Sequence, residues 1–525
     1  MRKLLLVILL FTCHAVLAQQ TTFSKVYYEP SGTGVESRSV VKTFDNGYLI
    51  AGKANYYMGY LLKTDASGVE VWNKFFNPSP NNFLEFKKII STTDSCFVIC
   101  GKLQLNQQNM AVLIKVNDTG DTLWSKTYSR TTEMLEVYNV SQTLDGGYIM
   151  AGSSAFISAP YTTMLIIKTN ANGDLQWMQT MQANNHTNSA YVIKQDADSN
   201  YVINGLLEEQ TGTSSFEIGM CLAKFSHTGA QLWAKKYFMP GNNVVWGYDF
   251  EITSSGYMCY LNYLNLDAVV KTDLQGNIVS GNSFSVSNST TINEPMPKIK
   301  KTHDGGYVFV AGSCFGPNIL YKVDSAGVYQ WASQLFLNSA EIVETNNNEL
   351  FIAGSGPLCG IRTSQVLWPQ IGMLQTDSTG NLPGSSCLYV TNIAPVAISL
   401  SATNVTFTLT SGGVQGNTQN IIGAFTLTGY DGCVDFLGGI NELGNNDISI
   451  SPNPAINMVT VKLNRFFTAQ SLRVYDITGK KVKEEMGQIN NSGVINVNVG
   501  DLPAGVYVVI IESSKGLLRQ RFVKL

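Results

Sequence analysis

The sequence has few charged residues and very few histidines. Asp, Glu, Lys and Arg make up 14% of the 525 residues, whereas about 25% is usual in soluble domains. Beyond residue 18 the histidines are His186, His227 and His303, and no two of them have the spacing of metal ligands. No Gly-x-Ser-x-Gly, His-Glu-x-x-His or P-loop pattern occurs. We therefore predict no catalytic residue, no cofactor and no metal.

Positive charge is scarce over most of the chain. The net charge is −3, of which residues 446–525 contribute +4 and residues 1–18 contribute +2, so residues 19–445 carry −9. An acidic body disfavours nucleic acid as a partner, because phosphates need basic surfaces. After the N-terminus, no apolar run is long enough for a transmembrane helix. Helical periodicity is also missing there, which favours short strands joined by turns.

The chain begins with the three parts of a secretory signal peptide. Two basic residues open it, an apolar run follows at residues 4–11, and Ala18 ends a small-residue cleavage site. We predict a signal peptide at residues 1–18 that is cleaved after Ala18. The alternative interpretation is a buried N-terminal strand.

One unit of turns and strands recurs seven times, at a period of roughly 50 residues. Each copy has an aromatic residue after a first turn and a glycine in a second turn. Five copies have a tryptophan four residues after that glycine. The aromatic residues are Tyr48, Phe97, Tyr148, Tyr201, Tyr257, Tyr307 and Phe351; the glycines are Gly68, Gly120, Gly173, Gly229, Gly276, Gly327 and Gly380; the tryptophans are Trp72, Trp124, Trp177, Trp233 and Trp331. This pattern is typical of four-stranded propeller blades.

The third copy shows where the strands of one blade are expected. Its turns, Asp-Gly-Gly and Asn-Ala-Asn-Gly, supply the positive φ that tight hairpins need. They predict strands at residues 137–143, 148–153, 164–169 and 175–180, with Trp177 filling the space between blades.

The ends of the repeat array predict a closed ring. The seventh copy lacks its fourth strand, and Phe23–Tyr28 is similar to the fourth strands of other copies. We expect Phe23–Tyr28 to complete the last blade beside the Gly380 turn, which leaves no unpaired edge within the ring. The prediction is an all-β chain with a seven-bladed β-propeller at residues 19–386. Six or eight blades are the alternatives.

Residues 387–445 lack the repeat signature and are rich in Ser, Thr, Val and Gly. Their alternation predicts a β-rich spacer or linker. An oxidising export route permits disulfides, although spacing does not fix their connectivity. The candidate disulfides are Cys387–Cys433, which flank the spacer, and Cys314–Cys359, in loops of adjacent blades. Cys100 takes the place of an alanine in other copies and is predicted to be a small buried residue.

Residues 446–525 contain about seven short alternating strands, which predicts an Ig-like β-sandwich. Four motifs stand out: Pro452-Asn453-Pro454; Val474-Tyr475-Asp476-Ile477-Thr478-Gly479-Lys480; Leu502-Pro503-Ala504-Gly505-Val506-Tyr507; and a closing basic strand with Arg521 and Lys524. In these motifs and their order the stretch resembles the C-terminal sorting domain of the type IX secretion system of Bacteroidota. The alternative is a carbohydrate-binding Ig-like module.

The resemblance implies a cellular location for the protein. It implies export in two steps, first by the signal peptide and then by the type IX secretion machinery as a partner of the C-terminal domain. In that family the sorting domain is commonly removed, and the cargo is released or attached to surface lipopolysaccharide. The repeats are similar to uncharacterised propeller-type arrays found upstream of such domains. Neither resemblance implies what the ring does.

Two functions stay open for the ring. The first is a surface binding or adhesion module whose variable loops bind an unknown protein or glycan. The second is a secreted glycan hydrolase, which needs two carboxylates at the mouth of the ring. Candidate contact residues for the first are the aromatic side chains Tyr56, Tyr57, Tyr161, Trp246 and Trp368.

Two smaller sets of residues have more than one interpretation. Arg38, Arg130 and Arg362 are the three arginines of the ring, and they either hold a carboxylate together or are solvated separately. A second set shares one turn position: Asp65, Asp273, Asp324 and Asp377. We expect each of these carboxylates to accept hydrogen bonds from its own turn. Calcium is the alternative, but it needs several oxygen ligands at fixed spacing.

Overall fold

The computed structural model describes residues 22–28, 34–55, 57–77, 82–157, 161–183, 186–210, 216–239, 244–263, 266–284, 298–311, 318–335, 337–355, 370–381, 389–390, 395–398, 400–406, 408–417, 421–423, 428–431, 448–463, 469–476, 481–489, 494–513 and 516–525. Within these ranges every regular element is a β-strand, so the all-β prediction is confirmed. The predicted signal peptide with Ala18 lies outside the described residues, and so do Cys314, Cys359, Cys387 and Cys433.

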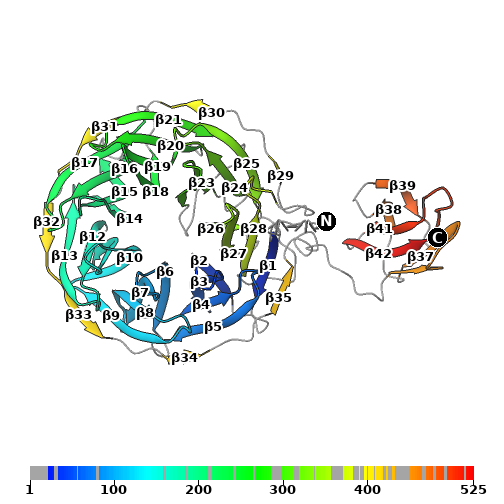
Figure 1. Ribbon diagram of the computed structural model, residues 1–525, viewed down its shortest axis with the longest axis horizontal. Coiled ribbons are helices and arrows are strands. Elements are labelled where there is room, and N and C mark those ends of the chain that lie inside the picture. Colours follow the sequence, from blue (N-terminus) through cyan, green and yellow to red (C-terminus); the bar gives the residue numbers. More distant parts are fainter. Residues whose placement is uncertain are drawn as a thin grey trace, which may run out of the picture.

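Seven antiparallel sheets of five strands are found in the described part of residues 22–431, and Figure 1 shows them side by side around a ring. In six sheets four strands come from one repeat, and in the seventh the N-terminal strand β1 (Phe23–Tyr28) joins three strands of the last repeat. From the ring's centre outward they are β2 (Val35–Lys42), β3 (Tyr48–Ala54), β4 (Met58–Thr64) and β5 (Glu70–Asn77); β6 (Phe83–Ser91), β7 (Phe97–Leu105), β8 (Gln108–Val116) and β9 (Thr122–Ser129); β10 (Glu133–Gln142), β11 (Tyr148–Phe156), β12 (Thr162–Thr169) and β13 (Leu175–Gln182); β14 (Asn188–Gln195), β15 (Tyr201–Gln210), β16 (Phe216–Phe225) and β17 (Gln231–Phe238).

The other three sheets continue the series. They are β18 (Val245–Thr253), β19 (Gly256–Tyr263), β20 (Leu266–Asp273) and β21 (Ile278–Phe284); β22 (Ile299–Lys301), β23 (Tyr307–Ala311), β24 (Asn318–Val323) and β25 (Tyr329–Leu335); β26 (Asn338–Glu344), β27 (Leu350–Ser355), β28 (Ile371–Thr376) and β1 (Phe23–Tyr28). The four strands predicted for the third repeat agree with β10 to β13 to within four residues at each end. The sequence therefore gives the strand pattern because its tight turns recur at fixed places.

The N-terminal strand completes the last sheet, as predicted. Strand β1 pairs antiparallel with β28, with Val26 opposite Gly372. Strand β28 ends directly before the turn that contains Gly380, whose N–H donates to the Asp377 carbonyl at 3.1 Å. The first and last parts of the repeat array thus share one sheet.

Buried side chains join each sheet to the next. In the described part of the ring there are seven such clusters, and one of them packs Tyr48 and Tyr60 of the first sheet on Phe351 and Met373 of the last. Trp177 packs partly buried in the cluster between the third and fourth sheets, with its ring centroid 6.1 Å from that of Tyr201. The prediction that this tryptophan fills the space between neighbouring units is confirmed.

Residues 389–431 differ from the spacer that the sequence suggested. They form short strands, two to four residues long, which we call the belt: β29 (Tyr389–Val390), β30 (Pro395–Ala397), β31 (Ser401–Asn404), β32 (Thr408–Ser411), β33 (Val414–Asn417), β34 (Ile421–Gly423) and β35 (Thr428–Asp431). Each belt strand adds a fifth strand to one sheet, in the order β25, β21, β17, β13, β9, β5 and β1. The belt therefore runs around the outer rim against the direction of the repeats (yellow and orange in Figure 1).

The C-terminal part forms two sheets on a common core. Strands β36 (Ile448–Ser451), β37 (Met458–Leu463) and β40 (Val494–Asn498) make one sheet, and β38 (Ala469–Asp476), β39 (Lys481–Ile489), β41 (Gly505–Ser513) and β42 (Gly516–Lys524) make the other. Val459 and Val497 from the first sheet and Val474, Val509 and Phe522 from the second share one buried cluster. The two sheets of this part therefore share one hydrophobic core.

Candidate functional site

A cavity of about 680 Å³ lies where the seven sheets meet. The innermost strand of every sheet contributes to its wall, namely β2, β6, β10, β14, β18, β22 and β26. The contributing residues belong to the later part of each strand, such as Lys88 to Ser91 in β6 and Glu341 to Glu344 in β26. The cavity is therefore on the axis of the ring, toward the side of the first tight turns. Cavities of this size are typical of small-molecule sites.

A repeated hydrogen bond ties neighbouring inner strands together around this cavity. Six inner strands have a β-bulge, and the next side chain in four of them accepts from a backbone N–H of the following sheet. These bonds are Ile89 N to Ser39 Oγ at 3.2 Å, Ile193 N to Asn139 Oδ1 at 3.2 Å, Ile299 N to Asp249 Oδ2 at 3.3 Å and Val40 N to Glu341 Oε2 at 3.1 Å. The last bond links the seventh sheet to the first. Polar side chains at these positions thus stabilise the inner edge of the ring.

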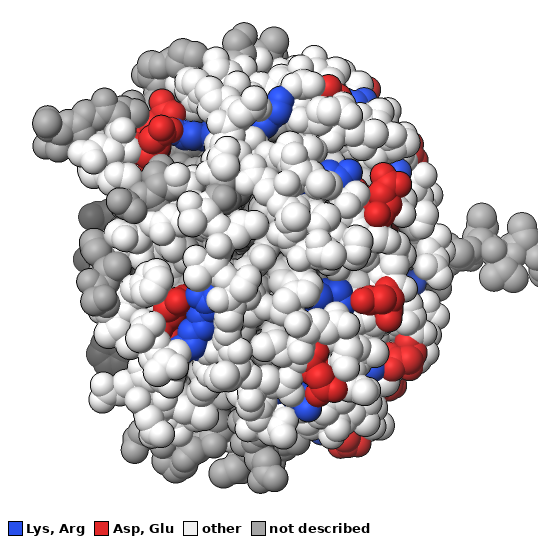
Figure 2. Space-filling view, turned by 90° about the vertical axis from the view of Figure 1, so that its left-hand side faces the viewer, with Lys and Arg blue, Asp and Glu red and all other residues white. Residues whose placement is uncertain are grey.

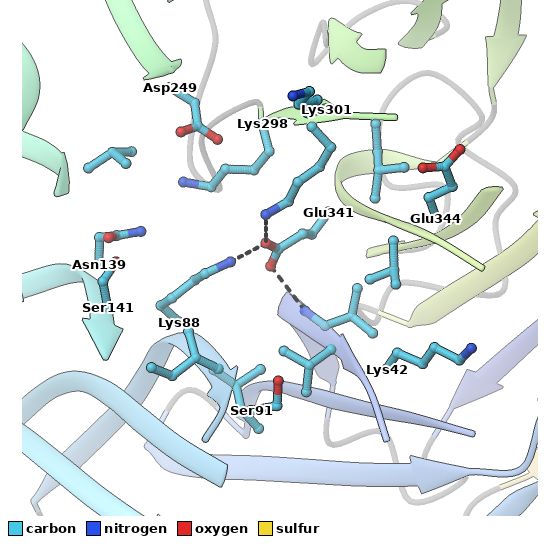
Figure 3. Close-up of a pocket in the computed structure, with 18 of the residues that line it drawn as sticks. Lys42, Lys88, Ser91, Asn139, Ser141, Asp249, Lys298, Lys301, Glu341 and Glu344 are labelled. Carbon is cyan, nitrogen blue, oxygen red and sulfur yellow. Dashed lines mark hydrogen bonds and ion pairs between the residues drawn. The ribbon is translucent and has the colours of Figure 1, made fainter. Parts of the chain in front are cut away.

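Glu341 is the most strongly held carboxylate of the cavity. Figure 3 shows it between Lys88, with which it forms an ion pair, and the backbone N–H of Val40. The Ser39 hydroxyl also donates to it, and the Lys300 Nζ lies 3.7 Å away. Burial would raise the pKa of Glu341, but Lys88 and Lys300 outweigh burial and lower it to about 2. Glu341 is therefore ionised at any pH at which the protein is expected to work.

The lysine partner of Glu341 has an unusual environment. Burial lowers the pKa of Lys88 to about 8, and the nearby ammonium groups of Lys300 and Lys298 act in the same direction, against the attraction of Glu341. Burial is the main cause, because the pKa of the neighbouring Lys300 is raised: there the attraction of Glu341, Glu251 and Asp249 outweighs burial. The wall as a whole contains six lysines and His303 against Asp249, Glu341 and Glu344.

The other two carboxylates of the cavity wall are also bound to the protein. Asp249 accepts from the backbone N–H groups of Phe250 at 2.8 Å and Ile299 at 3.3 Å. Glu344 accepts from both the backbone N–H and the Nδ1 of His303, each at 2.8 Å. These acidic groups hold adjacent strands together. Among the lysines, Lys194 pairs with Glu251 at 2.9 Å and Lys42 donates to Asn346 at 2.9 Å.

The structure separates the arginines that the sequence grouped. Arg38 lies in the axial region, where it forms ion pairs of 3.0 Å with Glu36 and Glu85. Arg130 instead pairs with Glu133 at 2.8 Å and donates to the carbonyl oxygens of the belt. Each is buried and bound within a different part of the ring, so these two do not form one carboxylate site. Arg362 lies outside the described residues.

The shared turn aspartates have the structural role that was predicted. Each side chain accepts two hydrogen bonds from backbone N–H groups of its own turn; for Asp65 the donors are Ser67 at 2.8 Å and Val69 at 2.9 Å. Asp273, Asp324 and Asp377 repeat this pattern. In the described ranges, no group of three or more His, Cys, Asp and Glu side chains is arranged to hold a metal ion.

Cys100 is fully buried in the cluster between the second and third sheets, as predicted. It is a free thiol, like Cys96, Cys221 and Cys259. Among the predicted contact aromatics, Tyr57 is 57% exposed, whereas Trp246 packs partly buried on two inter-sheet clusters. Tyr161 is half-buried, and Tyr56 and Trp368 lie outside the described residues.

The lysines of the cavity were missed by sequence analysis. Lys88 follows Lys87 in β6, and Lys300 precedes Lys301 in β22, so the sequence does not distinguish them from neighbouring lysines. Nothing in one repeat reveals which strand faces the axis. Most of the long connections between repeats fall outside the described residues.

The C-terminal motifs come together at the last strand. Asn453 accepts from the Val523 backbone N–H at 2.8 Å. The Ala455 N–H donates to the Val523 carbonyl at 2.7 Å, and the Leu525 N–H donates to the Ala455 carbonyl at 2.9 Å. Ala455 also forms a parallel bridge with Lys524. The Pro452-Asn453-Pro454 loop therefore fixes the end of the chain against the sandwich.

The remaining motif residues support the hairpin of β41 and β42. The Tyr507 hydroxyl donates to the Pro503 carbonyl at 2.8 Å, and Leu502 is buried in the core next to it. This bond closes the Leu502-to-Tyr507 motif on itself, directly where Gly505 begins β41. Tyr475 and Asp476 end β38 beside β41, opposite Val508 and Tyr507, and Gly479 lies outside the described residues.

One family model matches this part of the chain. Residues 449–525 match the secretion system C-terminal sorting domain. The sorting domain supports secretion of the chain by the type IX system and, in Bacteroidota, association with the cell surface or outer membrane. A comparison with curated proteins found no match for the chain. In the described ranges there is no helix with the length and apolar character to cross a bilayer.

Two solved structures are similar to the chain only at low identity. A crystal structure of a protein of unknown function from Dyadobacter fermentans has 8% sequence identity and a TM-score of 0.39, and covers 68% of this chain and 98% of that one. A protein of unknown function from Bacteroides caccae has 10% identity and a TM-score of 0.34, and covers 59% of this chain and 93% of that one.

Proposed function

We propose that the protein is a secreted, non-enzymatic binding protein, with residues 19–431 as a seven-bladed β-propeller and residues 446–525 as an Ig-like sorting domain. The seven five-stranded sheets, the seven clusters between them and the shared last sheet support the ring. The belt extends the propeller unit beyond residue 386, because its strands pair with the outer strand of every sheet. Export starts at a signal peptide cleaved after Ala18. The mature protein is then released or attached to surface lipopolysaccharide.

The observation that carries the binding function is the axial cavity. All seven sheets contribute to its wall, so a ligand there contacts a rigid frame from every side. A preformed site loses little conformational entropy when it binds. The outer surface offers less: Figure 2 shows a face that is mostly uncharged, with acidic and basic groups lying next to each other.

The hydrolase is the less favoured alternative. Asp249 and Glu341 both line the cavity, as a pair of catalytic carboxylates would. However, glycoside hydrolysis needs one carboxyl group that is protonated near neutral pH. The pKa of Glu341 is about 2, and Asp249 is bound to two backbone N–H groups. The geometry therefore favours binding over hydrolysis.

Blocking the cavity tests the binding function. The full chain is screened on glycan arrays and in pulldowns from the outer-membrane fraction and culture medium. Val41→Trp places a large ring at the cavity wall, where Val41 is half-buried. Leu144→Trp is the control, because Leu144 is 72% exposed on a turn. We expect Val41→Trp to abolish binding of the selected ligand and Leu144→Trp to retain it. Equal binding by both variants would place the ligand elsewhere and reject the axial site.

Export is tested by deleting residues 446–525. The deletion removes the whole sorting domain and leaves the ring intact, so we expect the protein to accumulate in the periplasm. Cell fractionation and surface labelling with an impermeant reagent measure its location. The double variant Lys481→Gln and Lys483→Gln, which changes only exposed ion pairs of that domain, is expected to be exported normally. Surface display of the truncated chain would refute sorting through this domain.

A further inference from the structure

The axial cavity is basic although the protein is acidic. The whole chain has a net charge of −3, yet the wall contains Lys42, Lys88, Lys194, Lys298, Lys300 and Lys301 against three carboxylates. Low-dielectric walls around charges of one sign focus the field into a cleft and raise the local concentration of counter-ions. The sign of this field selects anions.

The three carboxylates of the wall do not cancel this charge evenly. Glu344 is turned to His303, and Asp249 to the backbone of β18 and β22 and to Lys194, which also pairs with Glu251 at 2.9 Å. Glu341 forms the ion pairs with Lys88 and Lys300. Lys298 and Lys301 form no ion pair or hydrogen bond with the described residues. In Figure 3 the amino group of Lys88 points to Glu341, whereas that of Lys298 extends to the side on which Asp249 is drawn.

The types of side chain that line the cavity further restrict the chemical class of its ligand. No Phe, Tyr or Trp is found among the described residues that line the cavity, whereas sites for apolar and drug-like ligands are rich in aromatic side chains. No arginine lines it either. Lysine binds as a compact point charge with three rotatable donors, which suits a cluster of oxygens better than one planar carboxylate. The wall therefore fits a compact anion with several charges.

We infer that the axial cavity binds a small oxyanion that carries two or more phosphate or carboxylate groups, with Lys298 and Lys301 as its first contacts and Lys88 and Lys300 deeper in the wall. This rests on the proposed binding function and names its ligand class. Several lysines can each approach a different oxygen of such a molecule. A neutral glycan would leave the excess charge of the wall uncompensated.

The direct test measures binding of inorganic tripolyphosphate and of citrate to the full chain by titration calorimetry at low salt. Tripolyphosphate tests for a phosphate ligand and citrate for a carboxylate ligand. Maltotriose, which is neutral, is the negative control. We expect at least one oxyanion to bind, maltotriose to give no heat, and the affinity to fall as salt is raised. The double variant Lys298→Gln and Lys301→Gln is expected to bind roughly tenfold or more weakly.

The control variant removes the same charge from another surface. Lys74→Gln and Lys126→Gln break the ion pairs with Asp121 and Asp174 on the outer strands β5 and β9. This control is expected to bind the oxyanion as the natural protein does. Equal affinity of the two double variants would show that the anion binds outside the cavity and would overturn the inference. The inference would also be overturned if the protein bound neither oxyanion but bound a neutral ligand whose binding is abolished by Val41→Trp. That result would leave the proposed binding function intact.

Proton uptake gives a second readout. Lys88 faces Glu341, Lys298, Lys300 and the thiol of Cys100, and its pKa is lowered to about 8. A bound oxyanion stabilises the ammonium form and raises this pKa, so binding near pH 8 takes up protons. We expect the affinity to fall as the pH rises from 7 to 9. Calorimetry in buffers of different ionisation enthalpy measures the uptake, and no uptake would contradict a ligand beside Lys88.

Discussion

At the scale of single residues, one lysine in most repeats joins the two tight turns of its own sheet. The pairs are Lys63–Asp45, Lys115–Asp94, Lys168–Asp145, Lys224–Asp196 and Lys322–Asp304, with N···O distances from 2.5 to 2.8 Å. Burial acts to raise the pKa of Asp145, but the hydrogen bond from Lys168 prevails and lowers it to about 2. In the seventh repeat both partners change together, and Gln375 donates to Glu349 at 2.7 Å.

This paired change is present in the sequence, but it becomes informative only when the lysine and the turn aspartate are known to be partners. The turn glycines were predictable, because only a positive φ explains glycine at one fixed place in seven turns. The turn glycines also leave room for a side chain of a neighbouring sheet, and this role was not predictable from one repeat. A Cβ atom on Gly173 would lie 2.8 Å from the ring of Trp124 in the preceding sheet.

Two glycines of the third sheet allow the conformational role of a turn glycine to be separated from its packing role between sheets. Gly146 and Gly173 have φ values of 79° and 76°, but a Cβ atom on Gly146 would meet nothing within 4 Å. We expect Gly146→Ala to lower the free energy of unfolding by about 1–2 kcal/mol, the cost of a left-handed alanine. Gly173→Ala is expected to cost a further 1–3 kcal/mol or so, because Trp124 must move. Urea denaturation measures both, and equal losses would contradict packing between the sheets at this turn.

At the scale of elements, the belt is the part that the sequence did not reveal. Its strands are too short for a periodic pattern, and pairing with seven outer strands supplies the hydrogen bonds that define them. Arg130 adds a clamp: its Nε donates to the Gly412 carbonyl and its Nη2 to the Thr410 carbonyl, both at 2.9 Å. Because Arg130 also pairs with buried Glu133, the belt is fixed to the ring through a desolvated charge.

Removing this clamp should loosen the belt locally. Arg130→Met leaves Glu133 buried without its partner, which typically costs 3–5 kcal/mol. The double variant Arg130→Met and Glu133→Gln removes the uncompensated charge, so we expect it to regain most of that stability. Its belt should still be labile. Hydrogen exchange at Gly412, whose N–H donates to the Met178 carbonyl at 3.0 Å, is expected to be faster in both variants.

The comparison variant for this prediction is Arg38→Met. Arg38 pairs with Glu36 and Glu85 near the axis and does not touch the belt. The Arg38→Met substitution should lower the stability of the ring. The hydrogen-exchange rate at Gly412 should stay close to that of the natural protein under native conditions. Unchanged exchange at Gly412 in the Arg130 double variant would show that strand pairing alone holds the belt.

At the scale of the whole molecule, the path of the chain around the ring determines which features could be predicted from the sequence. The order of repeats could be predicted because each repeat has the same turns, and the closing strand because it is similar to the strands that it replaces. The axial lysines could not be predicted in the same way. Their proximity arises only when strands from different repeats, such as β6, β22 and β26, meet around one axis. Sequence periodicity describes each sheet, whereas the site belongs to the ring.

Strand β1 has both of its edges paired, by β28 and by β35. Its Tyr27 hydroxyl also donates to the Gly68 carbonyl of the first sheet at 2.8 Å. One strand thus connects the last repeat, the end of the belt and the first repeat. An open array of repeats would lose little stability when a terminal strand is removed, because each repeat contacts only its neighbours. A closed ring would lose the contact between its ends.

Deleting residues 22–28 distinguishes these cases. We expect the truncated chain to unfold at lower urea concentration and to associate through the exposed edges of β28 and β35. Adding the peptide Thr22–Tyr28 in excess should restore much of the loss, since a ligand at 100 times its Kd stabilises by about 2.7 kcal/mol. A scrambled peptide of equal composition should have no effect. If the truncated chain is monomeric and unfolds at the original midpoint, β1 does not close the ring, and the shared frame around the axial cavity has to be abandoned.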